Sequence, residues 1–222
     1  MSPVTGDRSF VGVGLRQRVR EAVVPLARAL GRLGLTPDAL TLIGFAVSVV
    51  AALAAAAGLW VAAGLLVVFG GLFDLFDGAL ARVQGKASPY GAFLDATFDR
   101  WGETVVFIGI AAGLLGPGAA GVVFPALGEW PAAALVAVLA GAAMGAAFMV
   151  SYSRAKAESV GFEAAVGVAP RAERIAVLAA GLVLQPATGW SLGAALLIIF
   201  ALATVTVIQR VAHVRAQART GR

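Results

Sequence analysis

The protein has 222 residues, of which 60% are hydrophobic and only 13% are charged, and it contains no cysteine. Soluble domains carry about 25% charged residues, so this composition excludes an ordinary soluble domain and predicts an all-α integral membrane protein. The net charge of +5 favours contact with anionic lipid, and no nucleic acid partner is expected. The lack of cysteine excludes disulfides and thiolate metal sites.

The N-terminal segment 1–37 is predicted to lie in the cytoplasm and to include an amphipathic helix over residues 13–33. Apolar residues recur there every three or four positions, with arginines between them. This pattern is typical of a helix that lies in the membrane interface with its basic face toward phosphates. The helix either anchors the chain or contributes directly to a site on that side.

The remainder, residues 38–222, is predicted to form one domain of six transmembrane helices. A spanning helix needs about 20 mostly apolar residues. The fifth of the six stretches is the shortest and is expected to extend slightly past Leu184, and Gln-Pro at 185–186 is interpreted as the break that follows it. Other breaks are expected near residue 61, at 85–89 and at 116–118. The predicted spans are 39–61, 63–83, 92–115, 131–156, 172–184 and 190–211.

The basic residues indicate the orientation of the six spans. All 17 Lys and Arg residues lie before the first span, around the loops that follow the second and fourth spans, or after the sixth. The other three loops contain none. By the positive-inside rule, both termini and the basic loops are predicted to be cytoplasmic in a multi-pass plasma membrane protein.

Four aspartates flank the loop between the second and third spans. Asp74 and Asp77 are three residues apart, and Asp95 and Asp99 are four apart, so each pair shares a helix face. Because the loop is short, the two helices should be antiparallel neighbours whose carboxylates meet in one cavity. Such a group repels itself unless a cation offsets the charge. Oxygen ligands, with His213 the only histidine and far away in sequence, suit Mg²⁺, Mn²⁺ or Ca²⁺, and Mg²⁺ usually shares its shell with a substrate phosphate.

Two other interpretations of the aspartates compete with a metal site. Salt bridges to Arg82 and Arg100 could neutralise them without a metal. An ion or proton path would need polar residues along several spans, and the first three spans have almost none toward the outer side. Acidic residues within membrane spans are functional by default, which favours the metal site.

Residues 74–99 follow the pattern D-x2-D-G-x2-A-R-x8-G-x3-D-x3-D. This pattern resembles the signature of the CDP-alcohol phosphatidyltransferase family of integral membrane enzymes, and all eight fixed positions match. The six-span plan and the amphipathic helix agree with the same family. The resemblance implies that a CDP-linked lipid, usually CDP-diacylglycerol, gives its phosphatidyl group to an alcohol while CMP leaves.

The resemblance also implies roles for individual residues. Asp74, Asp77, Asp95 and Asp99 would bind one or two Mg²⁺ or Mn²⁺ ions, and Asp99 would also be the catalytic general base on the acceptor hydroxyl. The segment "LTPDALT" resembles the family's nucleotide-holding stretch before the first span, although Asp38 stands where many members have Asn. The expected CDP-lipid ligands are Thr41, Asp38, Asp77, Gly78, Ala81, Arg82 and Gly91.

A second basic cluster lies at the cytoplasmic ends of the last three spans. As a set, these cations exceed what orientation needs, so they are expected to bind the phosphate of a phosphorylated acceptor; for any one of them, ordinary positive-inside flanking is the alternative. The cluster consists of Arg154, Lys156, Arg171, Arg174 and Arg210.

The surrounding residues, 151–174 and 209–215, resemble the phosphatidylinositol phosphate synthases of actinobacteria, which use inositol 1-phosphate. Archaeal enzymes that make the ether-lipid analogue share much of this pattern. The rival within the family is phosphatidylglycerophosphate synthase, which uses glycerol 3-phosphate, and the non-enzymatic alternative is an ion carrier or membrane scaffold. The family is typically homodimeric, and Gly141 with Gly145 offers a small-residue packing face, so a homodimer is expected. The loop 157–170 is either a lid or a connector.

Overall fold

The computed structural model describes residues 24–85, 87–123, 131–168 and 170–220. Within these ranges the chain is helical and contains no strand. The described part of the predicted amphipathic helix is helical over 24–32, and residues 13–23 lie outside the described residues. The long helices are α2 (Pro37–Ala56), α3 (Trp60–Gln84), α4 (Pro89–Leu114), α5 (Ala132–Ser159), α6 (Arg171–Thr188) and α7 (Ser191–Arg219).

Four of these helices, α2, α3, α5 and α7, are long and apolar enough to cross a membrane. The other two carry more charge: four charged residues lie between Asp95 and Glu103 of α4, and three lie in the first turn of α6. These charges all lie toward one end of the molecule, where the candidate site is found.

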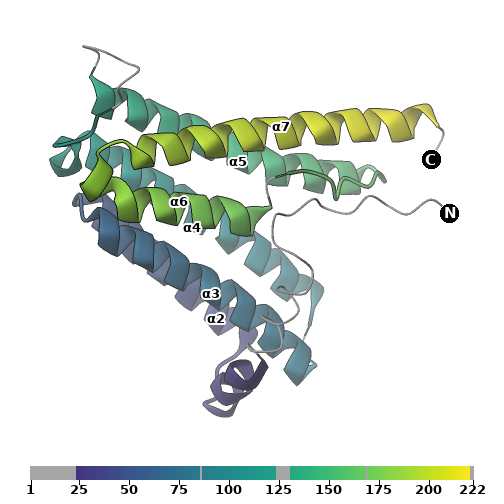
Figure 1. Ribbon diagram of the computed structural model, residues 1–222. Helices are drawn as coiled ribbons and strands as arrows, with labels where there is room; N and C mark the ends of the chain where they lie inside the picture. Colours follow the sequence, from purple (N-terminus) through teal and green to yellow (C-terminus); the bar gives the residue numbers. More distant parts are fainter. Residues whose placement is uncertain (1–23, 86, 124–130, 169, 221–222) are drawn as a thin grey trace.

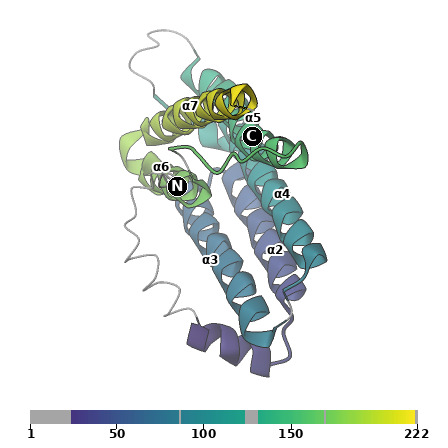
Figure 2. The same cartoon turned by 90° about the vertical axis from the view of Figure 1, so that its right-hand side faces the viewer.

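The main helix contacts close a ring in the order α2, α3, α6, α7, α5 and α4. Figures 1 and 2 show α4 and α6 as the two bridges between the α2–α3 pair and the α5–α7 pair. Because successive helices alternate in direction, α2, α4 and α6 begin at the same end of the ring at which α3, α5 and α7 finish. Charged residues from all six helices can therefore meet there.

Helices α2 and α4 approach each other very closely through glycine. A Cβ atom added to Gly109 would lie 2.6 Å from the Cα atom of Ala52, and one added to Gly113 would lie 3.1 Å from the carbonyl carbon of Ala55. Packing of small residues of this kind is how helices come together in a membrane, where no hydrophobic effect drives them. This contact sets the distance between the helices that carry Thr41 and Asp99.

The predicted break at Gln-Pro 185–186 is wrong. Pro186 lies inside α6, and the helix ends at Gly189, whose φ of 74° places it in the left-handed region. Gln185 holds this turn instead of breaking it: its Oε1 accepts from Leu192 N at 2.9 Å, and its Nε2 donates to Gly189 O at 2.7 Å. Membrane helices tolerate proline where polar groups nearby satisfy the backbone.

The first break also differs from its predicted place. Helix α2 ends at Ala56, Gly58 turns the chain with φ 76°, and α3 begins at Trp60, so the break precedes residue 61. The break at 85–89 is where the sequence places it. Gly85 ends α3 with φ 65°, and Ser88 Oγ caps α4 by accepting from Gly91 N at 3.0 Å.

Candidate active site

Three of the four predicted carboxylates come together at the charged end of the ring. Asp74 of α3 and Asp95 and Asp99 of α4 each place an oxygen within 4.8 Å of the others. The short 85–88 connection makes α3 and α4 antiparallel, and the spacing of three to four residues keeps the side chains on facing surfaces. All three are half-buried.

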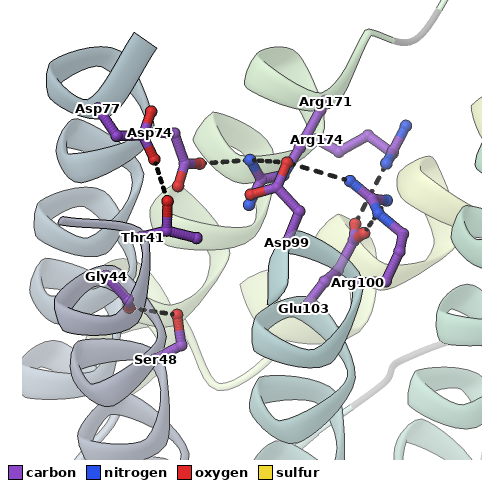
Figure 3. A network of polar contacts seen from close by, with 10 residues as sticks. All are labelled: Thr41, Gly44, Ser48, Asp74, Asp77, Asp99, Arg100, Glu103, Arg171 and Arg174. Atoms are coloured by element: carbon purple, nitrogen blue, oxygen red, sulfur yellow. Dashed lines mark hydrogen bonds and ion pairs between the residues drawn. The ribbon is translucent and has the colours of Figure 1, made fainter. Parts of the chain in front are cut away.

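Asp77 lies beside this cluster, facing α2. It is 5% exposed, and its Oδ2 accepts a hydrogen bond of 2.9 Å from Thr41 Oγ1 (Figure 3). Thr41 also donates to the carbonyl of Pro37 at 3.3 Å. The pairing ties the start of α2 to the end of α3.

Arginine offsets part of the negative charge. Arg171, the first residue of α6, contacts Asp74 and lies 2.7 Å from Asp99. Arg100 lies 3.8 Å from Asp99 as well. The salt-bridge interpretation of the aspartates is therefore realised in part. The main partner is Arg171, which lies 97 positions from Asp74 and is not one of the two arginines that this interpretation named.

The donor set fits a divalent cation. Asp74, Asp95 and Asp99 supply carboxylate oxygens, which Mg²⁺ and Mn²⁺ prefer, and the cluster includes no histidine. Arg171 contacts two of the three carboxylates, and Arg100 contacts Asp99 while it is also paired with Glu103, so the cluster keeps net negative charge. A divalent cation that shares its shell with a substrate diphosphate would balance that charge.

A cavity of about 220 Å³ lies beside the cluster, where α2 and α4 begin and α3 ends. Asp77 and Asp95 are part of its wall, so the carboxylates and this cavity adjoin. The structure brings all of the predicted CDP-lipid residues to this wall: Thr41, Asp38, Asp77, Gly78, Ala81, Arg82 and Gly91. We call it the nucleotide cavity.

A larger cavity of about 350 Å³ lies on the other side of the cluster, between α4, α5, α6 and α7. Five arginines and one glutamate, Glu158, contribute to its wall. We call it the acceptor cavity. Its arginines are Arg100, Arg154, Arg171, Arg174 and Arg210.

Lys156, a predicted acceptor ligand, is not among the residues that line the acceptor cavity. Arg154 is in the wall, and residues two apart on an α-helix point about 200° from each other. Lys156 therefore faces away from the cavity at the end of α5, where ordinary positive-inside flanking explains it.

Arg210 has a structural part in the acceptor cavity. Its Nε donates to Val166 O at 2.9 Å, and its Nη1 donates to Val150 O. It thereby fastens the segment that follows α5 to α7. Gln217 fastens the same segment further along, exchanging hydrogen bonds of 3.1 and 2.6 Å with the backbone of Glu163. The part of the 157–170 loop that the structure describes is thus a tethered wall of the cavity.

Two charged residues on this side of the site were not predicted there, since Arg100 was expected only as a salt-bridge partner of the aspartates and Glu103 had no predicted role. Arg100 lines the acceptor cavity, and Glu103 pairs with Arg100 at 2.6 Å and with Arg174 at 3.3 Å. A signal was available, because Glu103 follows Asp95 and Asp99 at the same spacing of four residues and so continues the acidic face of α4.

Backbone dipoles reinforce the side chains. Residues at the starts of α2 and α4 line the nucleotide cavity, and Pro170 and Arg171 at the start of α6 line the acceptor cavity. Helix N-termini favour anions such as phosphate. Both cavities are therefore suited to phosphate groups, with the carboxylate cluster between them.

Comparison with known proteins agrees with this geometry. The CDP-alcohol phosphatidyltransferase family model matches residues 34–212. The archaetidylinositol phosphate synthase of Methanothermobacter thermautotrophicus is 36% identical, with 90% of this chain and 91% of that protein covered. The phosphatidylinositol phosphate synthase of Mycobacteroides abscessus is also 36% identical, with 92% of this chain and 88% of that protein covered.

The solved structures that resemble the chain include crystal structures of phosphatidylinositol phosphate synthase from Mycobacterium tuberculosis. One has CDP-DAG bound and aligns with a TM-score of 0.72 at 30% identity, covering 86% of this chain and 92% of that one. Another is in complex with manganese and citrate and aligns with a TM-score of 0.73 at 30% identity, covering 86% and 88%. The chain therefore belongs to the CDP-alcohol phosphatidyltransferase family.

Proposed function

We propose that the protein transfers the phosphatidyl group of CDP-diacylglycerol to inositol 1-phosphate, giving phosphatidylinositol phosphate and CMP. The observation that carries this proposal is the order of the three parts of the site. The carboxylate cluster lies between a nucleotide cavity and a cavity walled by five arginines. A neutral acceptor would not explain so many cations, whereas an acceptor phosphate does.

The donor half of the reaction takes place at the nucleotide cavity. The small residues Gly78, Ala81 and Gly91 leave room for the ligand to approach the backbone, and Arg82 supplies positive charge to the diphosphate. Thr41 holds Asp77 in place through its hydrogen bond. The lipid chains of CDP-diacylglycerol stay in the bilayer while its headgroup reaches this cavity.

The protein uses Mg²⁺ or Mn²⁺, as one or two ions held by Asp74, Asp95 and Asp99, with Asp77 at the side of the site nearest the nucleotide. When bound there, the cation polarises the diphosphate and stabilises the charge that grows on the departing CMP.

Asp99 is the proposed general base. It takes the proton of the acceptor hydroxyl as the new oxygen–phosphorus bond forms and the bond to CMP breaks, because an alcohol is a weak nucleophile near neutral pH. Its position suits this role: Arg100 and Arg171, its two ionic partners, both line the acceptor cavity. The arginines would hold the phosphate of the acceptor so that the reacting hydroxyl of the same molecule faces the carboxylate cluster.

We also propose how the protein lies in the membrane. All six helices of the ring are proposed to span, α4 and α6 among them, since their charged residues face the site rather than lipid. The basic end, with both termini and the active site, is proposed to face the cytoplasm. The face of α5 at Gly141 and Gly145 has no heavy atom within 4 Å of an added Cβ, which supports a homodimer packed through small residues.

The test uses the purified protein with CDP-diacylglycerol and Mg²⁺ or Mn²⁺, and it measures CMP release with inositol 1-phosphate, glycerol 3-phosphate, free inositol or no acceptor. Release with inositol 1-phosphate and a new lipid of matching mass is the expected result. Release with glycerol 3-phosphate alone would assign the protein to phosphatidylglycerophosphate synthesis. A parallel series with the CDP-linked archaeal ether lipid shows which lipid tails are accepted. No release with any acceptor would remove the enzymatic proposal.

A further inference from the structure

We propose that Glu103 is a positioning residue, which aims Arg100 and Arg174 into the acceptor cavity and holds Arg100 back from the metal-binding carboxylates. The inference rests on the proposed function, because it assigns Glu103 a part in acceptor binding. Glu103 would act without touching the substrate, since it is not among the residues that line the acceptor cavity.

The charged side chains of the site alternate in sign. Figure 3 shows an unbroken series of contacts that runs from one side of the site to the other. Each arginine that lies between two acids in this series is shared by them, so its position depends on the balance of their attraction. The series is Asp74, Arg171, Asp99, Arg100, Glu103 and Arg174.

The distances show which acid holds Arg100. Its Nη1 lies 2.6 Å from Glu103, a short charge-assisted hydrogen bond, whereas its Nη2 lies 3.8 Å from Asp99. The stronger attachment is therefore to Glu103, one helical turn further into α4. If Glu103 lost its charge, Asp99 would be the nearest remaining carboxylate for Arg100, and the guanidinium would compete there with a bound cation.

Glu103 also pairs with Arg174. The side chain of Arg174 is 3% exposed and that of Glu103 is 14% exposed, and the pair lies 3.3 Å apart. Charges held in such surroundings keep their position only when they are paired and hydrogen-bonded. Glu103 and Arg174 also line a small cavity of about 50 Å³ that borders Asp74 and Arg171, so the pair lies directly against the carboxylate cluster.

The test compares Glu103→Gln, Glu103→Asp and the wild type. Glutamine keeps the shape of Glu103 and removes its charge, so we expect the KM for inositol 1-phosphate to rise about tenfold. The KM for CDP-diacylglycerol should change less than about twofold, and Mn²⁺ binding, measured by the loss of the free-ion EPR signal, should weaken. Aspartate keeps the charge and should restore Mn²⁺ binding and most of the acceptor affinity.

The matched control is Glu163→Gln, because Glu163 is exposed and holds Gln217 through its backbone atoms. It should match the wild type in all measurements. Unchanged acceptor KM and Mn²⁺ binding in Glu103→Gln would overturn the inference, as would an equal rise in the KM of both substrates. If Glu103→Gln does not fold, Glu103→Asp becomes the deciding variant. Mn²⁺ binding weaker than that of the wild type, together with an unchanged acceptor KM, would then overturn the inference. A wild type that binds Mn²⁺ but uses no inositol phosphate would instead refute the proposed function.

Discussion

The packing of α2 against α4 makes a quantitative prediction for Gly109→Ala. The added Cβ would lie 2.6 Å from Ala52 Cα and 2.7 Å from its carbonyl carbon, whereas ordinary contacts begin at 3.4 Å. The two helix backbones must separate by about 1 Å to admit it, and overpacking of this kind costs about 1–3 kcal/mol. Alanine regains about 1 kcal/mol through its better helix propensity. The expected net loss of unfolding free energy is therefore up to about 2 kcal/mol.

The same movement should reduce activity, because α2 carries Thr41 and α4 carries Asp95 and Asp99. The assay is unfolding in detergent, followed by loss of helical signal, together with CMP release under saturating substrate. Gly71→Ala is the matched control, since its added Cβ would meet only side-chain atoms of Ile175, at the ordinary distances of 3.7 and 3.8 Å, and it should be as stable as the wild type or slightly more so. If Gly109→Ala proved as stable and as active as Gly71→Ala, the described contact between α2 and α4 would be refuted.

Three further substitutions test the site. Asp99→Asn should keep CDP-diacylglycerol binding but lose about 10²–10⁴-fold in turnover, as expected when a general base is removed; normal turnover in a stopped CMP-release assay would exclude Asp99 as the base. Arg154→Gln should raise the acceptor KM while Lys156→Gln should not, because only Arg154 lines the acceptor cavity, and equal effects would contradict the assignment. Thr41→Val removes the hydrogen bond to Asp77 and should weaken CDP-diacylglycerol binding, measured by calorimetry, with little effect on the acceptor KM. Unchanged affinity for the donor lipid together with a raised acceptor KM would contradict this role.

Much of the donor side of the site could be predicted from the sequence, because its geometry is local. Asp74, Asp77, Asp95 and Asp99 lie on two helices joined by a short loop, so helical spacing alone brings their side chains toward one region. The small residues and Arg82 belong to the same hairpin. Asp38 and Thr41 are the exceptions, and their place in the nucleotide cavity followed from the resemblance and not from periodicity.

The acceptor side could be predicted only as a group of cations. Which of them face inward depends on how α5, α6 and α7 rotate against α4, and this is set by long-range packing such as Gly181 against Ala195. Helical periodicity within α5 predicts that Arg154 and Lys156 point in different directions, but the sequence does not show which of these directions faces the cavity. The contact between Arg171 and Asp74 joins residues that are 97 positions apart, and no local sequence pattern predicts it.

The missed turn has a similar explanation. Proline at 186 is a strong local break signal, yet α6 continues past it because Gln185 binds the backbone of the turn and of α7. Ser191 adds a hydrogen bond of 2.8 Å to the carbonyl of Gly181. These hydrogen bonds tie the end of α6 to the start of α7 and hold the turn that follows Pro186.

The central claim is that Asp74, Asp95 and Asp99 hold the cation that works on the CDP-lipid diphosphate. An anomalous difference map at the manganese edge, from crystals grown with Mn²⁺ and CDP-diacylglycerol, tests it most directly. The account predicts a peak within coordination distance of these three carboxylates, with diphosphate oxygens completing the shell. Arginine contacts alone at the carboxylates, with the manganese peak elsewhere or missing, would contradict it.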